Sequence, residues 1–526
     1  MSDLWTAGWR ERSWSDLDRP WDLIVIGGGI TGAGILREAG RLGWRGLLVE
    51  ARDFASGTSS RSSKLVHGGL RYLASMQLRL TAESVHERQR LLRERRGLVE
   101  PLENILASYA GDRPPKWMMG AALALYDLLA LEWRHQYHPA AEIEKMCPSI
   151  NPEGMTGGYG YWDAQTDDAR LVLRVLGEAV RAGGTALSYA PVEGLLRDSS
   201  GRVHGVQLRD QVSGREKEVR SPVVINASGA WADHLRSHVD ATPRLRRLRG
   251  SHFFFPWNKL PLTQAITFMH PSDRRPVFAY RWEGVTILGT TDVDQQGDVP
   301  ADPHLSPREI DYLMEAARHA FKPLNLGLGD VQSAISGVRA VVNTNQADPS
   351  KESREFVLWD EHGLLTVTSG KLTTFRLMAR RALHAVRRRL PDHSAAKPGQ
   401  PELGRSDCGR LTDLGPALSA RLLGRYGDAA SELARSAQPG ELEPIGDTPS
   451  LWAELRWAAR SEGVVHLEDL LLRRVRLGLI SPYGGLPLVD RIRSIVQPEL
   501  GWDDTRWDAE VSAYSHLWTQ SYSAGQ

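Results

Sequence analysis

One segment near the N-terminus, residues 22–50, constrains the fold of this chain more than any other. It has an apolar run at residues 23–26, a glycine turn, a helical stretch, and a second apolar run that ends in an acid. Gly27, Gly29 and Gly32 have the spacing G-x-G-x-x-G, which allows a tight turn, close approach of a pyrophosphate, and close packing of helix and strand. The segment therefore predicts a βαβ unit that binds an adenine dinucleotide.

The residues around this turn have the chemistry that a dinucleotide needs. Ile30 and Thr31 begin the helix, whose free N–H groups and dipole favour the pyrophosphate. Glu50 ends the second strand at the spacing of an acid that binds ribose hydroxyls. A second candidate turn at residues 327–329 lacks its third glycine, because Gln332 stands there. A single fingerprint predicts one dinucleotide, and it does not separate NAD from FAD.

The size, charge and cysteine content of the chain narrow the class of protein. Its 526 residues predict two or three domains, and a net charge of +1 gives no sign of a nucleic-acid surface. The two cysteines, Cys147 and Cys408, lie far apart and form no metal-ligand or disulfide pattern, so we expect a reducing compartment and no metal. Residues 1–20 carry charge throughout and lack the apolar stretch of a secretory signal.

The longest apolar stretch, residues 117–133, leaves two interpretations open. It is shorter than the roughly 20 residues that a transmembrane helix needs, and Asp127 interrupts it. Basic and aromatic residues flank both ends, as in helices that lie in a membrane interface. The stretch is therefore either a buried packing helix or an interfacial helix.

Periodicity and turn signals along the rest of the chain predict alternating helices and strands. Helices are expected at residues 77–96 and 168–182, and strands at 185–189, 192–208, 218–227, 251–256 and 286–289. Residues 391–404 are rich in proline and polar residues and predict a linker. Beyond it, amphipathic runs such as 452–462 and 467–479 predict a helical region.

A late strand–turn–helix pattern at residues 363–389 adds a second candidate cofactor contact. Gly370 ends the strand and precedes the helix. In flavin enzymes a helix N-terminus can face the pyrimidine edge of the isoalloxazine, where its N–H groups and dipole stabilise negative charge. The Gly370 turn is therefore a candidate for that position.

The run SSKLVHGGLRYL at residues 62–73 resembles a motif of the FAD-dependent glycerol-3-phosphate dehydrogenases, respiratory enzymes of the glycine/D-amino-acid oxidase-like superfamily. Similar motifs occur in the family order: IVIGGGITGAGI (24–35), DDARLVL (167–173), INASGAWAD (225–233), RGSHFFFP (249–256), ILGTTDVD (287–294), SGVRA (336–340), SREFVL (353–358) and GKLTTFR (370–376). The resemblance covers residues 21–479. Departures are Thr31 in place of the more usual Asn, a longer extension at residues 1–19, and no EF-hand loop after Leu479.

The resemblance implies an α/β architecture with a Rossmann-like FAD-binding domain, an interleaved α+β substrate domain, and a helical C-terminal domain. The FAD-binding domain is expected to be discontinuous within residues 21–390, at about 21–110, 150–240 and 330–390. The substrate domain is expected at about 111–149 and 241–329, the linker at 391–404, and the helical domain at 405–526. Residues 1–20 form an extension without an assigned role.

The resemblance also implies which residues bind non-covalent FAD and substrate. For FAD they are Gly27, Gly29, Ile30, Thr31, Gly32, Glu50, Ala51, Ser59, Ser60, Ser62, Lys64, Leu65, His67, Gly68, Gly69, Ala227, Gly229, Trp231, Gly370, Lys371, Leu372 and Thr373. For substrate they are Arg71, Tyr72, His252, Thr291, Asp292, Arg339, Arg354 and Lys371. Arginine suits a phosphate because it forms bidentate contacts with the phosphate oxygens. Arg71, His252, Arg339 and Lys371 are expected to be catalytic, with His252 as the first choice of base.

The activity implied by the resemblance is oxidation of sn-glycerol 3-phosphate to dihydroxyacetone phosphate. Electrons are expected to pass to membrane quinone, which predicts a cytoplasmic enzyme, peripheral on the inner face of the membrane, and a homodimer. Three alternatives stay open: an oxidase that uses oxygen, an FAD oxidase of the same fold acting on an amino acid, and a non-catalytic FAD-binding protein. The expected set of cations argues against the last two, because a carboxylate substrate or a binding module needs fewer positive charges.

Overall fold

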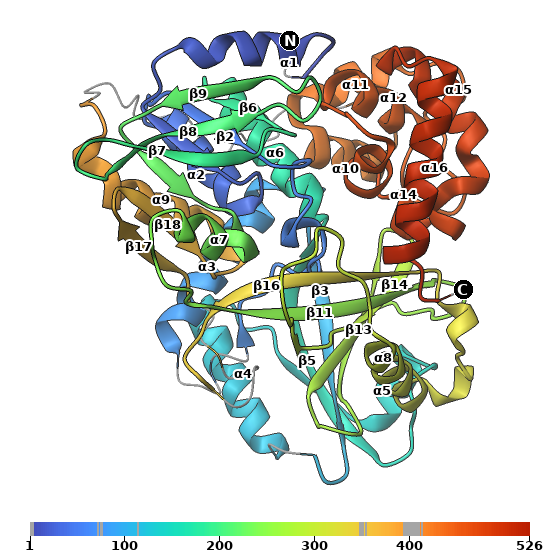
Figure 1. Ribbon diagram of the computed structural model, residues 1–526. Helices are drawn as coiled ribbons and strands as arrows, with labels where there is room; N and C mark the ends of the chain where they lie inside the picture. Colours follow the sequence, from blue (N-terminus) through green and yellow to red (C-terminus); the bar gives the residue numbers. More distant parts are fainter. Residues whose placement is uncertain are drawn as a thin grey trace.

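The computed structural model of the chain describes residues 5–70, 73, 77–112, 115–346, 352, 355–392, 411 and 414–525. Figure 1 shows three parts: a first sheet covered by helices, a second and larger sheet, and a group of helices near the C-terminus. The first two parts are built from alternating stretches of the chain. This arrangement confirms the predicted α/β architecture with interleaved sheets and a helical C-terminal region.

The first sheet contains the predicted βαβ unit. Its strands are β17 (Val357–Glu361), β18 (Leu364–Thr368), β10 (Val224–Asn226), β1 (Leu23–Ile26), β2 (Gly46–Val49) and β6 (Thr185–Leu187), in this spatial order. All run parallel except β17, which is antiparallel to β18. The short central strands are buried along their whole length, as parallel strands covered on both faces are, which explains their unbroken apolar sequences.

The second sheet holds the strands from the middle of the chain together with three that come from other segments. In the described ranges its order is β15 (Val293–Asp294), β11 (Leu245–Pro256), β14 (Val285–Gly289), β13 (Pro276–Trp282), β12 (Ala265–Met269), β3 (Val99–Tyr109), β5 (Met155–Thr166) and β4 (Gln136–His138), while β16 (Ser333–Val342) pairs with β11. The predicted division placed β3, β5 and β16 with the FAD-binding segments. In the structure these three strands belong to the second sheet instead, where β3 pairs with β5 and β12, and β16 pairs with β11.

Two predicted strands are each divided by a turn. Residues 192–208 form β7 (Val192–Arg197) and β8 (Val203–Arg209), which pair with β9 (Glu216–Arg220) in a small third sheet. The Asp198 carboxylate accepts hydrogen bonds from the amides of Ser200 and Arg202 and fixes the turn between β7 and β8. Residues 218–227 likewise contribute to β9 and, after a break, to β10. Single long strands were therefore a wrong prediction at both places.

Helices cover the first sheet and the ends of the second. They are α1 (Trp9–Ser15), α2 (Ile30–Arg41), α3 (Leu78–Glu94), α4 (Lys116–Ala130), α5 (Ala140–Met146), α6 (Asp168–Arg181), α7 (Ala232–Ser237), α8 (Pro307–Ala320) and α9 (Phe375–Val386). Helix α2, which follows the glycine turn, packs against α6 and α9. The helices predicted at residues 77–96 and 168–182 are confirmed as α3 and α6.

The C-terminal part is helical, as expected. Its helices are α10 (Pro416–Tyr426), α11 (Ala430–Ser436), α12 (Trp452–Ser461), α13 (Leu467–Asp469), α14 (Leu477–Ile480), α15 (Val489–Leu500) and α16 (Asp504–Ser521). The run 467–479 is not one amphipathic helix: α13 continues into a π-helical turn, Leu470–Arg474, and Arg476 has a left-handed φ of 67°. This run is distorted because Arg473, Arg474 and Arg476 are buried against carboxylates of the first part.

The N-terminal extension joins two of these parts. The Trp5 ring lies 5.4 Å from the ring of Phe54, and its indole N–H donates to the carbonyl of Ala186 at 3.4 Å. Trp5 also forms an isolated β-bridge with Glu462, which ends α12. The extension therefore ties the first sheet to the C-terminal helices, a role that its sequence alone did not indicate.

Candidate active site

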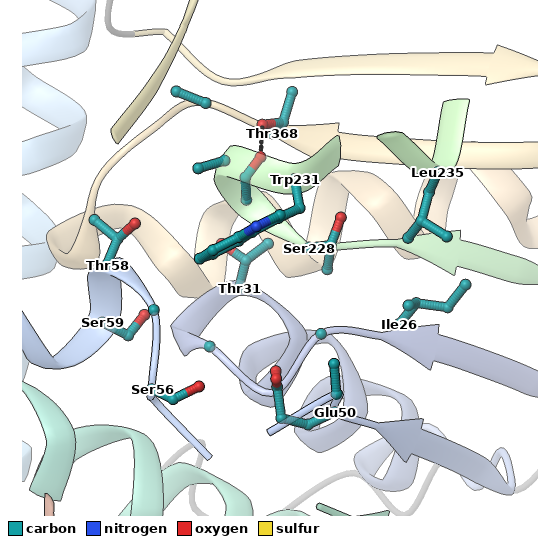
Figure 2. A pocket seen from close by; sticks show the side chains of 18 of the residues that line it. Ile26, Thr31, Glu50, Ser56, Thr58, Ser59, Ser228, Trp231, Leu235 and Thr368 are labelled. Carbon is teal, nitrogen blue, oxygen red and sulfur yellow. Dashed lines mark hydrogen bonds between the residues drawn. The ribbon is translucent and has the colours of Figure 1, made fainter. Parts of the chain in front are cut away.

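A cavity of about 590 Å³ lies at the carboxyl ends of the parallel strands of the first sheet. Ile26 of β1, Val49 of β2, Ala227 after β10 and Thr368 of β18 all line it. In open α/β sheets ligands bind outside the carboxyl ends of the strands. Figure 2 shows this wall of the cavity, with Thr31 and Trp231 facing the space from different elements. The position and size of the cavity suit a dinucleotide.

The glycine turn has the geometry that its spacing predicts. Gly27 has a φ of +115°, which side chains rarely adopt. A Cβ atom on Gly32 would lie 1.9 Å from the Gly27 carbonyl oxygen, so α2 approaches β1 this closely only with glycine at this position. The amide of Ile30, in the first turn of α2, donates to the Ser59 hydroxyl at 3.0 Å. The turn therefore presents the first amides of a helix to the cavity, beside a serine-rich loop.

Glu50 is held in place by the backbone on both sides of it. One carboxylate oxygen accepts from the amide of Gly28 at 2.6 Å, and the other accepts from the amide of Arg52 at 2.9 Å. Burial raises the pKa of Glu50 above its ordinary value, against these two hydrogen bonds. Its side chain reaches the cavity at the end of β2, where Figure 2 shows it below the glycine turn.

The Gly370 turn lines the opposite side of the same cavity. Gly370 has a φ of +81° and connects β18 to the helical turn Leu372–Thr374 and then to α9. Lys371 follows it, and its ammonium group donates to the Ser84 hydroxyl at 3.2 Å. The start of a helix and a cation thus line the same cavity as Glu50.

Arg339 of β16 also lines the cavity, and an acid holds its guanidinium. The Asp292 carboxylate lies 2.8 Å from Arg339 and 3.2 Å from Arg275. Its neighbour Thr291 donates to Glu309 at 2.9 Å and accepts from the amide of Ser251 at 3.0 Å. Thr291 and Asp292 do not themselves line the cavity. Asp292 contacts the guanidinium of Arg339 and fixes its position, and the hydrogen bonds of Thr291 hold the neighbouring backbone.

His252 lies on β11, on the same face of the second sheet as Arg339. Arg339 pairs with Leu248 across β11 and β16, and residues four apart along a strand share a face. The His252 Nε2 atom lies 2.9 Å from the Ser63 hydroxyl, and Nδ1 is buried without a hydrogen-bond partner in the described part of the chain. Burial, and then the nearby charges of Lys64 and Arg339, lower the pKa of His252 to about 3. The imidazole is therefore neutral at physiological pH.

The cavity brings together many, but not all, of the residues predicted from the sequence. Those that line it are Gly27, Gly29, Ile30, Thr31, Glu50, Ala51, Ser59, Ser62, Ala227, Gly229, Trp231, Arg339, Gly370, Lys371 and Leu372. Those outside its lining are Gly32, Ser60, Lys64, Leu65, His67, Gly68, Gly69, His252, Thr291, Asp292 and Thr373. Arg71, Tyr72 and Arg354 lie outside the described residues.

Lys64 shows why a residue in a cofactor-binding motif need not line the cavity. Its side chain is completely buried, and its ammonium lies 3.2 Å from both carboxylate oxygens of Asp168 and from the carbonyl of Ser60. Burial, with help from the nearby Arg476 charge, lowers the pKa of Lys64 to about 8. These contacts hold the serine-rich loop against the start of α6.

Sequence reasoning missed several residues of the cavity wall. They are Ser56, Gly57, Thr58, Ala190, Pro191, Val192, Glu193, Ser228, His234, Leu235, Val299, Ala301, Thr368 and Ser369, among others. Ser56–Thr58 belong to the serine-rich loop, so that composition was a usable signal. Val299 and Ala301 come from the connection between β15 and α8 of the second part. The remaining residues reach the cavity because β6, β10 and β18 lie in the same sheet as β1 and β2, which no local pattern indicates.

The described residues fit a flavin dinucleotide from end to end. The acid after β2 suits the ribose, the N-terminus of α2 suits the pyrophosphate, and the start of a helix with Lys371 suits the electron-rich edge of the flavin. The fold and this cavity together define the class of FAD-dependent oxidoreductases.

Comparisons with known proteins agree with this class and narrow it. The family model for FAD-dependent oxidoreductases matches residues 22–376, and the model for the C-terminal domain of alpha-glycerophosphate oxidase matches residues 392–507. The aerobic glycerol-3-phosphate dehydrogenase of Staphylococcus saprophyticus is 33% identical over 494 residues, 88% of each chain. The glycerol-3-phosphate dehydrogenase of Bacillus halodurans, solved with FAD, superposes with a TM-score of 0.77 at 27% identity over 98% of each chain. The chain therefore belongs to the family of FAD-dependent glycerol-3-phosphate dehydrogenases, and FAD is its cofactor.

A more distant structure shares the fold. The L-alpha-glycerophosphate oxidase of Mycoplasma pneumoniae, also with FAD bound, has a TM-score of 0.57 at 16% identity and covers 73% of this chain and 99% of its own. At this level of identity the likeness extends to the fold alone.

Proposed function

We propose that this enzyme oxidises sn-glycerol 3-phosphate to dihydroxyacetone phosphate. The observation that carries the proposal is that Arg339 and Lys371, two cations suited to a phosphate, line the same cavity as the FAD cradle. An amino-acid substrate carries no phosphate and needs fewer positive charges. The names of the family members above support the same substrate.

Among the residues that the structure describes, Arg339 is the one proposed to bind the phosphate of the substrate. Its contact with Asp292 fixes the guanidinium while leaving about a quarter of the side chain exposed to the cavity. A preoriented guanidinium binds phosphate oxygens in two parallel hydrogen bonds. Arg71, Tyr72 and Arg354 are proposed to complete the phosphate site, by the resemblance of their motifs alone. Lys371 is proposed to serve the flavin edge, the substrate, or both.

His252 is the proposed base for the C2 hydroxyl of the substrate. If its Nε2–H donates to Ser63, the lone pair stands on Nδ1, the buried atom that has no partner in the described part of the chain. A neutral imidazole with a free lone pair can accept the hydroxyl proton as the C2 hydrogen leaves. Bound FAD supplies the hydride acceptor at its N5 atom.

Anaerobic titration tests the substrate. We expect sn-glycerol 3-phosphate to bleach the visible absorption band of the protein-bound flavin, and glycine, D-alanine and glycerol to leave it unchanged. The discrimination is expected because glycine, D-alanine and glycerol all lack the phosphate that Arg339 and Lys371, which line the cavity, are proposed to bind. A flavin that stays oxidised with sn-glycerol 3-phosphate, or that bleaches with an amino acid, would contradict the proposed substrate.

We also propose that a membrane quinone reoxidises the flavin and that α4 is the membrane contact. One face of α4 is in the core, where Leu123, Tyr126 and Ala130 are buried. The other face and the residues after it expose large apolar side chains: Trp117, Met118, Leu128, Leu131 and Trp133. Leu131 is 83% exposed and Trp117 71% exposed. A patch of this kind marks an interaction site. Helix α4, which carries it, lies at the outer edge of the molecule in Figure 1.

The apolar stretch was expected to be either a buried packing helix or an interfacial helix. Helix α4 has a feature of each, because one face packs in the core and the other is exposed. No helix in the described part of the chain is long and apolar enough to cross a bilayer. A helix that lies in the interface, with its apolar face in the lipid, is compatible with both findings.

The paired change Leu128→Glu and Leu131→Glu tests the membrane contact. We expect binding to phospholipid vesicles to fall at least tenfold, because each leucine that enters lipid contributes roughly 1.5–3 kcal/mol. Co-sedimentation with vesicles of mixed neutral and anionic lipid measures the binding. Val212→Glu is the matched control, since Val212 is an exposed apolar residue in the turn between β8 and β9, away from α4 in the chain. Equal binding of the pair variant and the wild type would exclude α4 as the contact.

The alternative acceptor is oxygen, as the name of the Mycoplasma oxidase suggests for that protein. Admitting air to the reduced enzyme and, in a separate sample, adding a water-soluble quinone separates the two. Rapid reoxidation by quinone with little hydrogen peroxide in air supports the dehydrogenase. Stoichiometric hydrogen peroxide at a comparable rate supports the oxidase.

A further inference from the structure

A segment of the second part of the molecule forms one wall of the FAD cavity. Residues 295–306 connect β15 to α8 without regular secondary structure. Two of its apolar side chains, Val299 and Ala301, line the cavity with residues of the glycine turn and the serine-rich loop. The segment, here called the cover segment, therefore crosses from the second sheet to the cofactor site.

One acidic side chain fastens the cover segment to the FAD-binding part. The Asp302 carboxylate places one oxygen 2.9 Å from Arg52 and the other 2.5 Å from Arg61. Arg61 also donates to the carbonyl of Ala301 at 3.1 Å. Arg52 is the residue whose amide holds Glu50, and it lines the cavity itself. The carboxylate thus joins the cover segment to both ends of the loop at residues 52–61, several residues of which line the cavity.

The arginines have further partners that keep them in place. Arg61 donates to the Tyr522 hydroxyl at 2.8 Å, and Arg52 donates to Glu468 at 3.3 Å. Both arginines are thus anchored to the C-terminal helices as well. Asp302 is partly accessible, with 19% of its side chain exposed. The backbone of the cover segment has one contact with the same helices, from the Ser521 hydroxyl to the Asp302 carbonyl at 3.4 Å. The Asp302 carboxylate therefore binds two arginines whose positions are fixed by other partners.

We propose that Asp302 is a positioning residue that holds the cover segment closed over bound FAD, so that its ion pairs with Arg52 and Arg61 limit how fast FAD enters and leaves. The proposal concerns the cofactor and is independent of the substrate. Because FAD passes only when the segment opens, weakening these ion pairs raises the open population and speeds both binding and release. A residue that merely stabilises the fold would slow binding when it is replaced, because its replacement would disorder the site.

The test compares the wild type with Asp302→Asn. We expect the rate constants for FAD release and for FAD binding to apoprotein each to rise about tenfold, the effect of removing one charge-assisted hydrogen bond from the closed state. Flavin fluorescence in a stopped-flow instrument follows both reactions. The Asn variant is expected to fold, since both arginines keep other hydrogen-bond partners. The longer carboxylate of Asp302→Glu is expected to restore most of the slow exchange.

Asp330→Asn is the matched control. Asp330 forms an ion pair with Lys259 at 2.8 Å in the same part of the molecule and does not line the cavity. We expect its FAD rates to equal those of the wild type. Unchanged rates in Asp302→Asn would overturn the proposal. It would also be overturned if release became faster while binding became slower and the thermal unfolding midpoint of the apoprotein fell.

Discussion

Replacing His252 with glutamine is expected to lower the rate constant of flavin reduction by sn-glycerol 3-phosphate by about 10²–10⁴-fold, the usual contribution of a general base. Glutamine retains a donor toward Ser63 but has no basic nitrogen for the substrate hydroxyl. Anaerobic stopped-flow absorbance measures the reduction directly and is independent of the final electron acceptor. FAD content should not change, because His252 does not line the cofactor cavity.

The pH dependence of the same rate constant checks the ionisation of this residue. A base is active in its deprotonated form, and burial lowers the pKa of His252 to about 3. Protonation of this group should therefore cause no loss of rate between pH 8 and pH 5. A histidine with an ordinary pKa of about 6.5 would lose more than tenfold of its rate by pH 5.

His270→Gln provides the control for this experiment. His270, which directly follows β12, is also fully buried, and its ring is stacked on Tyr312 with Nε2 at 2.9 Å from the Tyr312 carbonyl. Its variant should reduce the flavin at the wild-type rate. A normal rate in His252→Gln would rule out the proposed base. A break near pH 6.5 that disappears in His252→Gln would keep the base but contradict the lowered pKa.

The cofactor cradle could be predicted from the sequence because its determinants are local. Gly27, Gly29 and Gly32 act through spacing alone, and Glu50 lies one strand further on. Gly27 and Gly32 have, respectively, the positive φ and the close packing that such a turn needs, and Glu50 contacts the amide of Gly28 within it. The Gly370 turn is a similar case, since the strand, the turn and the helix start are contiguous.

The cavity residues that could not be predicted are those brought to the site by strand pairing between segments far apart in the sequence. β1 pairs with β10, about 200 residues later, and β10 pairs with β18. These pairings bring Ser228 and Thr368 to the cavity, and no pattern within either segment indicates them. The same reason explains why the sequence did not indicate that β3, β5 and β16 pair in the second sheet.

Buried charge is the other feature that the sequence concealed. The run at residues 467–479 has the alternation of an amphipathic helix, whose charged face is ordinarily in water. Instead Arg473 and Arg474 are almost completely buried and both contact Asp53. The acid that pairs with them lies more than 400 residues earlier, so only the folded chain reveals the pairing.

This pairing predicts a large loss of stability in Asp53→Asn. Asp53 accepts hydrogen bonds from Arg473 at 2.5 Å and from Arg474 at 2.6 and 2.8 Å, and its side chain has no exposure to solvent. The substitution leaves Arg473 with Glu468 and Asp469 as partners, whereas it removes the carboxylate that forms an ion pair with Arg474. Breaking a buried pair at one side costs about 3–5 kcal/mol, which we expect as the fall in the free energy of unfolding. Urea unfolding of the apoprotein, followed by circular dichroism, measures it.

The difference between the wild type and Asp53→Asn should depend on pH in a defined direction. Burial alone would raise the pKa of Asp53, but the Arg474 and Arg473 charges outweigh it and hold the pKa below its ordinary value. The stabilisation is therefore fully present above about pH 3.9, the pKa of an unfolded aspartate, and is lost only as the pH falls through the lower folded value. The two proteins should differ most near neutral pH and converge in strong acid.

A second substitution tests whether the stability is lost because a charge is left buried without its partner or because the fold is damaged in general. Adding Arg474→Met to Asp53→Asn removes the uncompensated buried charge and should recover much of the stability, since apolar side chains of similar size often replace buried ion pairs at little cost. Glu11→Gln is the surface control, because the Glu11–Arg215 ion pair is exposed to solvent and should contribute little to stability. A double variant no more stable than Asp53→Asn would contradict the argument from buried charge.

The same variant should also weaken FAD binding, because Asp53 lies in the segment that shapes the cavity. It is three residues from Glu50 and next to Phe54, whose ring lies between the glycine turn and Trp5 of the N-terminal extension. The C-terminal helices thus act on the cofactor site through Arg473 and Arg474 without contacting the cavity. If added FAD stabilises Asp53→Asn as strongly as it stabilises the wild type, the buried pair supports the fold alone; a smaller stabilisation by FAD is the expected result.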